Sequence, residues 1–166
     1  MSIVLAAVGA LVAALLELTL VPYVEIDGAY PHPVLIFAII WTTVIGLEGG
    51  LAIAVVGGLA LDLLAPRPLG SSVFTLLVSV GGAALLAQPL ARLRYLAPVV
   101  SVFLFSMVNS LLFLAVYGAL RSPIPVEDPI ARVLPGAIYD AVIALAVGPI
   151  AVAIRERRLS AERPDW

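Results

Sequence analysis

The chain has 166 residues, of which 63% are hydrophobic and 12% are charged, and its net charge is −2. A soluble domain of this length cannot hide so much apolar surface, and the slightly acidic balance argues against nucleic acid as a partner. The absence of cysteine excludes disulfides and thiolate metal sites, and the single histidine excludes a histidine-rich metal site. The composition therefore predicts an integral membrane protein that works within the lipid bilayer.

Six apolar segments follow one another along the chain, and a helix needs about 20 such residues to cross a bilayer. Proline-rich polar loops at 22–33 and 121–131 follow the first and the fifth segments. Glu48 with Gly49 and Gly50 predicts a tight turn between the second and third segments. We expect an all-α membrane protein with a single six-helix transmembrane domain over 1–154 and a charged cytoplasmic tail over 155–166. The expected helices cover about 3–21, 34–47, 49–64, 71–90, 95–120 and 133–154.

Six crossings place both ends of the chain on one side of the membrane, and the arginines indicate which side. The side of the termini carries six arginines, which are Arg92, Arg94, Arg155, Arg157, Arg158 and Arg163. The opposite side carries three, which are Arg67, Arg121 and Arg132. Because cytoplasmic segments are enriched in basic residues, we expect both termini in the cytoplasm and the two proline-rich loops outside.

Small residues recur at intervals of four in the third segment, at Gly46, Gly50, Ala54 and Gly58, and Asp62 continues the same series. Helices gain no hydrophobic energy from meeting in lipid, so small residues that let two backbones approach closely become contact surfaces. The ridge therefore predicts a close helix contact, although spacing by four also arises by chance in a chain rich in alanine and glycine. The short loop after Leu64 predicts that the third and fourth segments form an antiparallel hairpin.

Three acidic residues, Glu17, Asp62 and Asp140, lie within apolar segments. A carboxylate at membrane depth is costly unless it is paired, protonated or hydrated. In the expected orientation all three lie in the outer half of the bundle, near the level of Arg67 and Arg132. We therefore expect an outer-half polar cluster or cavity, with Asp62 paired to Arg67 or Arg132. The alternative is that each acid simply reaches its nearest interface.

Little in the sequence points to catalysis. Tyr139-Asp140 and Asp62 invite comparison with intramembrane aspartyl proteases, but Ala60 stands where their Gly-x-Gly-Asp motif needs its second glycine. His32 lies between two prolines in a loop, where we expect a surface residue rather than a ligand, so a Ser-His mechanism has no histidine within a helix. No phosphate-cradling loop or metal-ligand cluster is present. We expect no enzymatic activity and no cofactor.

A glycine-rich helix leads here into a Gly-Leu-x-x-Asp element, which is followed by a short loop, a Leu-Gly pair and another apolar helix. Gly50 lies in the glycine-rich helix. The residues of the element that follow it are Gly58, Leu59 and Asp62 in that helix, and Leu69 and Gly70 after the loop. The stretch from 50 to 82 thereby resembles the rod shape-determining protein MreD family. The length of the chain, its six expected spans and Pro33 before the second segment also agree with that family, whereas Ala54 stands where many relatives carry glycine.

The resemblance implies a non-catalytic subunit of the bacterial elongation (rod) complex in the inner membrane. Such a subunit would bind MreC, a bitopic protein, and through it act with MreB filaments and with the peptidoglycan synthases RodA and penicillin-binding protein 2. Its role would be cell-shape maintenance and lateral peptidoglycan synthesis. The resemblance also implies a fold similar to the substrate-binding component of energy-coupling factor transporters. A small-molecule (vitamin-like) binding component of a transporter is therefore the alternative function.

Overall fold

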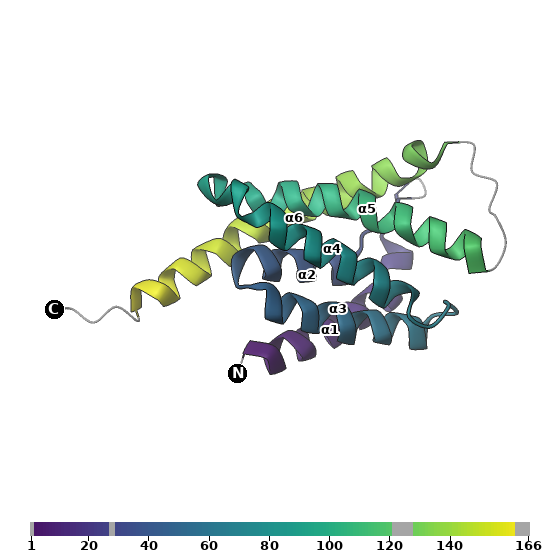
Figure 1. Ribbon diagram of the computed structural model, residues 1–166, viewed down its shortest axis with the longest axis horizontal. Helices are drawn as coiled ribbons and strands as arrows, with labels where there is room; N and C mark the ends of the chain where they lie inside the picture. Colours follow the sequence, from purple (N-terminus) through teal and green to yellow (C-terminus); the bar gives the residue numbers. More distant parts are fainter. Residues whose placement is uncertain (1, 27–28, 121–127, 162–166) are drawn as a thin grey trace.

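The computed structural model describes residues 2–26, 29–120 and 128–161, and over these ranges the chain is helical with no strand. Figure 1 shows the helices lying side by side in one elongated bundle. Helix α1 begins and helix α6 ends at the same end of this bundle. The described residues form α1 (Ser2–Thr19), α2 (Pro33–Val44), α3 (Leu47–Leu64), α4 (Ser71–Ala87), α5 (Ala97–Leu120) and α6 (Pro129–Ala161), with short 3₁₀ helices η1 (Val21–Tyr23) and η2 (Pro89–Leu93).

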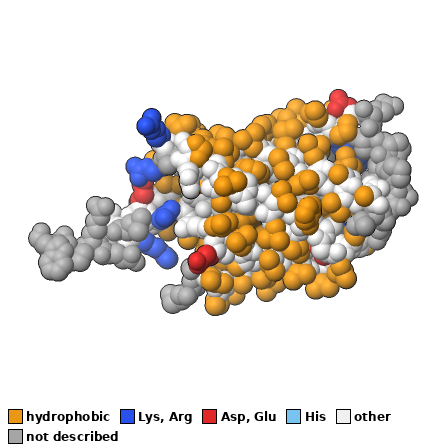
Figure 2. All heavy atoms as spheres, viewed as in Figure 1, with side chains coloured by type: hydrophobic (Ala, Val, Ile, Leu, Met, Phe, Trp, Pro, Cys, Tyr) orange, Lys and Arg blue, Asp and Glu red, His pale blue; other side chains and the backbone are white. Residues whose placement is uncertain are grey.

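The surface of the bundle is apolar around its middle. Large hydrophobic side chains on α1, α5 and α6 are exposed, and Figure 2 shows hydrophobic side chains covering the facing side of the molecule between its two ends. Four helical stretches in the described part of the chain are long and apolar enough to cross a membrane: 3–23, 47–64, 97–119 and 129–158. Helices α2 and α4 are apolar but shorter, with 12 and 17 residues. The expected all-helical membrane protein is thus confirmed, with four of its six expected spans long enough.

Helix α2 forms the centre of the bundle. Nine of its 12 residues are buried, and α1, α3, α4, α5 and α6 all contact it. A helix that is apolar on every side is stable where other helices enclose it. Its 12 residues span about 18 Å at 1.5 Å per residue, well short of the roughly 30 Å of a bilayer core. Helix α2 is therefore a core element that its neighbours shield from the surroundings.

The predicted turn between the second and third segments is wrong in position. The chain turns at Ile45 and Gly46, where Gly46 has a φ of +152° that favours glycine. Glu48, Gly49 and Gly50 instead form the first turn of α3. A side chain at Gly49 would collide with Trp41 of α2, and one at Gly50 would collide with Thr42. The glycine pair therefore lets α2 and α3 approach closely, as small residues do in membrane helices.

The last helix is longer than its apolar segment. Helix α6 begins at Pro129 rather than near 133, and it continues through Arg155 and Arg158 to Ala161, where we expected a separate charged tail. Arginine and glutamate are good helix formers, so hydropathy marks where a membrane span ends rather than where a helix ends. The expected fourth segment also ends early, because Pro89 starts η2 instead of continuing α4.

Helix α3 makes close contacts along its small-residue faces. A Cβ atom at Gly58 would lie 2.8 Å from the backbone N and Cα of Val73 in α4, and one at Gly57 would lie 2.6 Å from Val34 in α2. Ala54 is fully buried in the same helix. Helices α3 and α4 pack against each other across a short loop, as expected for a hairpin.

Candidate functional site

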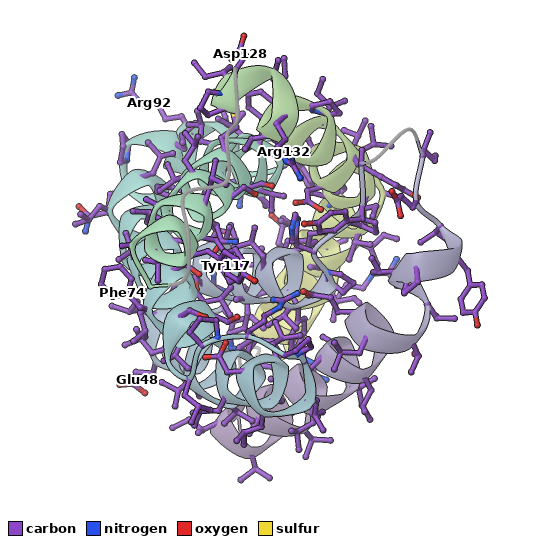
Figure 3. The ribbon with its side chains drawn as sticks, turned by 90° about the vertical axis from the view of Figure 1, so that its right-hand side faces the viewer. Glu48, Phe74, Arg92, Tyr117, Asp128 and Arg132 are labelled. Carbon is purple, nitrogen blue, oxygen red and sulfur yellow. The ribbon has the colours of Figure 1, made fainter. Side chains whose placement is uncertain are left out.

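A cavity of about 320 Å³ lies at the end of the bundle opposite the start of α1 and the end of α6. Figure 3 looks onto this end, where Tyr117 and Arg132 point toward the middle of the ring of helices, while Asp128 points away from it. The volume is within the range of small-molecule sites. The polar side chains that line the cavity are Glu17, Tyr30, His32, Arg67, Ser72, Thr75, Asn109, Ser110, Tyr117 and Arg132.

Asp62 caps the N-terminus of α4 beside this cavity. Its carboxylate accepts hydrogen bonds from the backbone N–H groups of Gly70 at 2.8 Å and Ser72 at 3.0 Å, and from the Ser71 hydroxyl at 3.3 Å. The first N–H groups of a helix lack partners within it and favour a negative charge. The expected partner of Asp62 was Arg67 or Arg132, and that prediction is wrong because the helix end supplies the donors.

Glu17 and Arg67 connect three parts of the chain at the wall of the cavity. The Arg67 guanidinium lies 4.0 Å from the buried Glu17 carboxylate, donates to the Ser72 hydroxyl at 3.4 Å and lies 5.3 Å from the centre of the Phe113 ring. Glu17 also accepts a hydrogen bond of 3.3 Å from the Val34 N–H, in the first turn of α2. The loop after α3 is thereby tied to α1, and α1 to α2.

Asp140 is fully buried and joins α6 to two other parts of the chain. It accepts hydrogen bonds from the His32 backbone N–H at 2.8 Å and from the Ser106 hydroxyl of α5, and its Oδ2 lies 2.9 Å from His32 Nδ1. The His32 side chain is only 17% exposed, so the prediction of a surface histidine is wrong. A buried carboxylate needs donors, but this requirement alone did not point to His32 as the donor. Nothing in the sequence singled out Ser106.

These contacts do not form a familiar catalytic arrangement. The Ser106 hydroxyl donates to Asp140 Oδ2, the same oxygen that contacts His32, so the hydroxyl is not activated by the imidazole. Asp62 and Asp140 use separate sets of donors rather than sharing a proton as paired catalytic aspartates do. Within the described ranges, no group of three or more His, Cys, Asp or Glu side chains is placed to hold a metal ion.

The structure gathers most of the expected polar cluster in one place. Glu17, Arg67 and Arg132 line the cavity directly. Asp62 and Asp140 lie behind its wall, each hydrogen-bonded to a lining residue, Ser72 or His32. In the glycine-rich element, Gly70 has a left-handed φ of +87° at the start of α4, whereas Leu59 and Leu69 are exposed on the surface of the bundle.

His32 lies between η1 and α2, outside the helices, and its contacts shift the pKa of its imidazole. Burial alone would lower the pKa of its imidazole, and Arg67 acts in the same direction. The hydrogen bond and negative charge of Asp140, together with the charge of Glu17, outweigh both effects and raise the pKa above its usual value. The folded state therefore favours the protonated ring.

We expect the stability that His32 contributes to be complete below about pH 6.5, the usual histidine pKa, and to be lost as the pH rises through the raised pKa of the folded state. Thermal unfolding of the wild type and of His32→Gln in detergent, measured from acidic to alkaline pH, checks this. The difference between the two unfolding temperatures should shrink as the pH rises. A difference that does not change with pH would contradict the assignment of His32 as the titrating group.

A second hollow, an apolar groove of about 790 Å³, is lined by residues of α1, α2 and α6. Helices α1 and α6 do not contact each other within the described residues, so Phe37 and Trp41 of α2 form the floor between them. Gly9 and Ala13 contribute to the α1 wall of the groove. Arg155 and Arg158 of α6 line one of its ends. The groove lies within the apolar part of the surface.

Comparison with known proteins identifies the family of this fold. The family model of the rod shape-determining protein MreD matches residues 1–153 of the 166. No curated protein and no solved structure matches the chain significantly, so the expected likeness to transporter substrate-binding components has no support from solved structures. The match covers all helices up to the last part of α6, and on this ground the chain belongs to the MreD family of rod shape-determining proteins.

Proposed function

We propose that this chain is a non-catalytic inner-membrane subunit of the bacterial elongation complex that binds MreC. Through MreC it would act with MreB, RodA and penicillin-binding protein 2 to maintain cell shape and support lateral peptidoglycan synthesis. The observation that carries the proposal is the family match over 1–153. The polar cluster is consistent with it, because each buried carboxylate holds parts of the fold together and none is placed beside an activated nucleophile.

We propose an orientation with both termini in the cytoplasm. Among the described arginines, five lie at the end where α6 finishes, and Figure 2 shows basic side chains gathered there. They are Arg92, Arg94, Arg155, Arg157 and Arg158. Arg67 and Arg132 lie at the cavity end. The asymmetry supports the cavity end as the outer one, and Arg121 and Arg163, which also entered the expectation, lie outside the described residues.

We further propose that the membrane helix of MreC lies in the groove between α1 and α6. The groove has the apolar surface that a membrane helix needs, and the small side chain of Ala151 on the α6 wall allows a partner backbone to approach closely. Arg155 and Arg158 at its cytoplasmic end would face the polar segment that precedes or follows such a helix.

Cysteine cross-linking can test this binding site, because the chain contains no cysteine of its own. Val12 is exposed in the groove on α1, and Val78 is exposed on α4 outside the groove lining. We expect Val12→Cys to cross-link to single cysteines placed along the MreC membrane helix in intact membranes, and Val78→Cys to cross-link far less. Equal cross-linking of the two variants would remove the groove as the binding surface. Failure of MreC to co-purify in both detergent and lipid would remove the partner itself.

A second candidate function is a small-molecule binding component of a transporter, and the cavity at the outer end favours it. Resemblance to the substrate-binding components of energy-coupling factor transporters would imply an alanine-rich surface that binds the coupling subunit of the transporter. In α1, however, Ala6, Ala10 and Ala14 are fully buried, and α1 packs closely against α3, which leaves that ridge unavailable for docking. Uptake that depends on an ATPase module would support the candidate, and ligand binding without uptake would separate binding from transport.

A further inference from the structure

Asn109 is a polar residue of the cavity whose hydrogen-bonding capacity is unused. Its side chain lines the cavity from α5, and the residue is only 8% exposed. Within the described part of the chain, no group donates to its buried Oδ1 atom. Buried side-chain oxygens nearly always have a partner, and the other buried polar residues around the cavity, such as Glu17 and Thr75, have theirs. The Asn109 amide is therefore available for a bound molecule.

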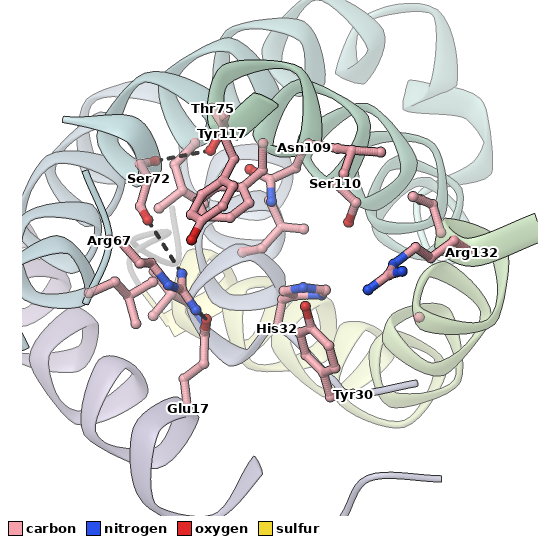
Figure 4. A pocket seen from close by; sticks show the side chains of 18 of the residues that line it. Glu17, Tyr30, His32, Arg67, Ser72, Thr75, Asn109, Ser110, Tyr117 and Arg132 are labelled. Atoms are coloured by element: carbon pink, nitrogen blue, oxygen red, sulfur yellow. Dashed lines mark hydrogen bonds and ion pairs between the residues drawn. The ribbon is translucent and has the colours of Figure 1, made fainter. Parts of the chain in front are cut away.

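Two guanidinium groups reach into the same space from opposite sides. Figure 4 shows Arg67 on one side of the cavity, beside Glu17 and Ser72, and Arg132 entering from α6 on the other side. No carboxylate of the described residues forms an ion pair with Arg132, and the one contact of Arg67 with a carboxylate is long, at 4.0 Å. Guanidinium groups bind the oxygens of phosphates through paired hydrogen bonds. Arg132 thus offers a guanidinium at this mouth that no carboxylate of the described residues pairs with.

Apart from the ten polar side chains, the lining of the cavity is apolar. Leu61, Leu76, Phe113 and Leu114 contribute to the walls. A hydrated inorganic ion would leave these surfaces wet, whereas a molecule with an apolar portion would cover them. The site thus combines separated positive charges, one buried amide and a hydrophobic wall.

We propose that this cavity binds an organic phosphate, with the phosphate between Arg67 and Arg132 and a further polar group on the Asn109 amide. The apolar part of the ligand lies against Phe113 and the neighbouring leucines. An acidic phospholipid headgroup and a small soluble phosphate ester share this chemistry. The inference rests on ligand binding at the cavity named for the second candidate function, and it requires neither transport nor MreC.

Binding of two probes to the purified full-length protein in uncharged detergent tests the proposal. The probes are a short-chain phosphatidylglycerol and glycerol 3-phosphate, which carries a similar phosphate without acyl chains. We expect saturable binding of one molecule per chain, measured by calorimetry and native mass spectrometry. Binding of the lipid alone would identify a phospholipid, and equal binding of glycerol 3-phosphate would identify a soluble ester. No saturable binding of either probe would overturn the proposal.

Arg132→Gln is the decisive variant, because Arg132 is exposed and the protein should fold without it. We expect it to weaken the apparent affinity about tenfold, the change expected from losing one charge-assisted hydrogen bond. Arg92→Gln removes the same charge from an exposed site in η2, which follows α4 at the end of the bundle where α1 begins (Figure 1), and should bind normally. Equal weakening in both variants would mean that only general surface charge attracts the probe, and would overturn the site.

Asn109→Leu separates a binding role from a structural one. It removes the buried amide and keeps nearly the same volume, so we expect the unfolding temperature without ligand to hold or rise while binding falls. A fall in both would show that Asn109 supports the fold rather than the ligand. Co-purification with MreC, measured on the same preparations, should be unchanged in Arg132→Gln. These two measurements therefore distinguish a failure of the phosphate site from a failure of the proposed binding to MreC.

Discussion

Replacing Asp140 by alanine is expected to lower the free energy of unfolding by about 3–5 kcal/mol. Asp140 is fully buried, and the substitution leaves the His32 backbone N–H, the His32 ring and the Ser106 hydroxyl without their acceptor. Each buried donor that loses its partner costs about 1–3 kcal/mol. The same change removes the hydrogen bonds by which Asp140 joins α5 and α6 to the segment before α2. It leaves α6 joined to that segment by the Tyr139 hydroxyl, which donates to the Val24 carbonyl at 3.1 Å.

Unfolding of purified protein in detergent, followed by circular dichroism against temperature and denaturant, measures this effect. Asp128→Ala is a matched control, because Asp128 is an exposed acid that caps the start of α6 through the Ile130 and Ala131 N–H groups at 3.0 and 3.1 Å. The loss of such a cap costs about 1 kcal/mol. The loss of unfolding free energy in Asp140→Asn should lie between those of Asp140→Ala and Asp128→Ala, since asparagine keeps an acceptor oxygen. If Asp140→Ala were no more destabilising than Asp128→Ala, the buried network would not hold the bundle together.

Gly58→Ala is expected to destabilise the protein by about 1–3 kcal/mol, although alanine is the better helix former. The added Cβ would lie 2.8 Å from the backbone N and Cα of Val73. Backbone atoms cannot turn aside as a side chain can, so α3 and α4 would have to separate along their crossing. Close approach of helices is the main source of their association in lipid.

Gly81→Ala is the matched control for this effect. Gly81 lies within α4, and no atom lies within 4 Å of a Cβ added there. The substitution should be neutral or stabilise by up to about 1 kcal/mol. Unfolding measured side by side for both variants isolates the contact from the intrinsic preference for helix. Two variants of equal stability would show that the α3–α4 crossing tolerates an extra methyl group.

Much of the architecture could be predicted from hydropathy and from the spacing of small residues. The apolar segments predicted an all-helical membrane protein, and the element from 50 to 82 predicted the MreD family, which the match over 1–153 confirms. The α2–α3 turn was misplaced because glycine pairs usually break helices. Here Gly49 and Gly50 lie inside α3 and allow Trp41 and Thr42 to approach. A glycine pair in an apolar segment predicts a turn and a crossing equally well.

The partners of the buried acids were harder to predict, for two physical reasons. Charge alone suggested an arginine for Asp62, but the free N–H groups of α4 are equally good donors and lie closer along the chain. His32 and Asp140 are 108 residues apart, and no local pattern connects a loop histidine to an acid in the last helix. Only the packing of α2 against α5 and α6 brings them together.

The shortness of α2 has an electrical consequence. Its 12 residues leave about 12 Å of a 30 Å hydrocarbon layer uncovered along its axis, and the cavity occupies the space above its first turn. In the proposed orientation, solvent that enters this cavity brings the outside medium closer to the middle of the bilayer. The voltage across the membrane then falls over a thinner insulating layer in the middle of this protein than in the surrounding lipid, and the charges of His32 and Arg67 lie at the edge of that steeper field.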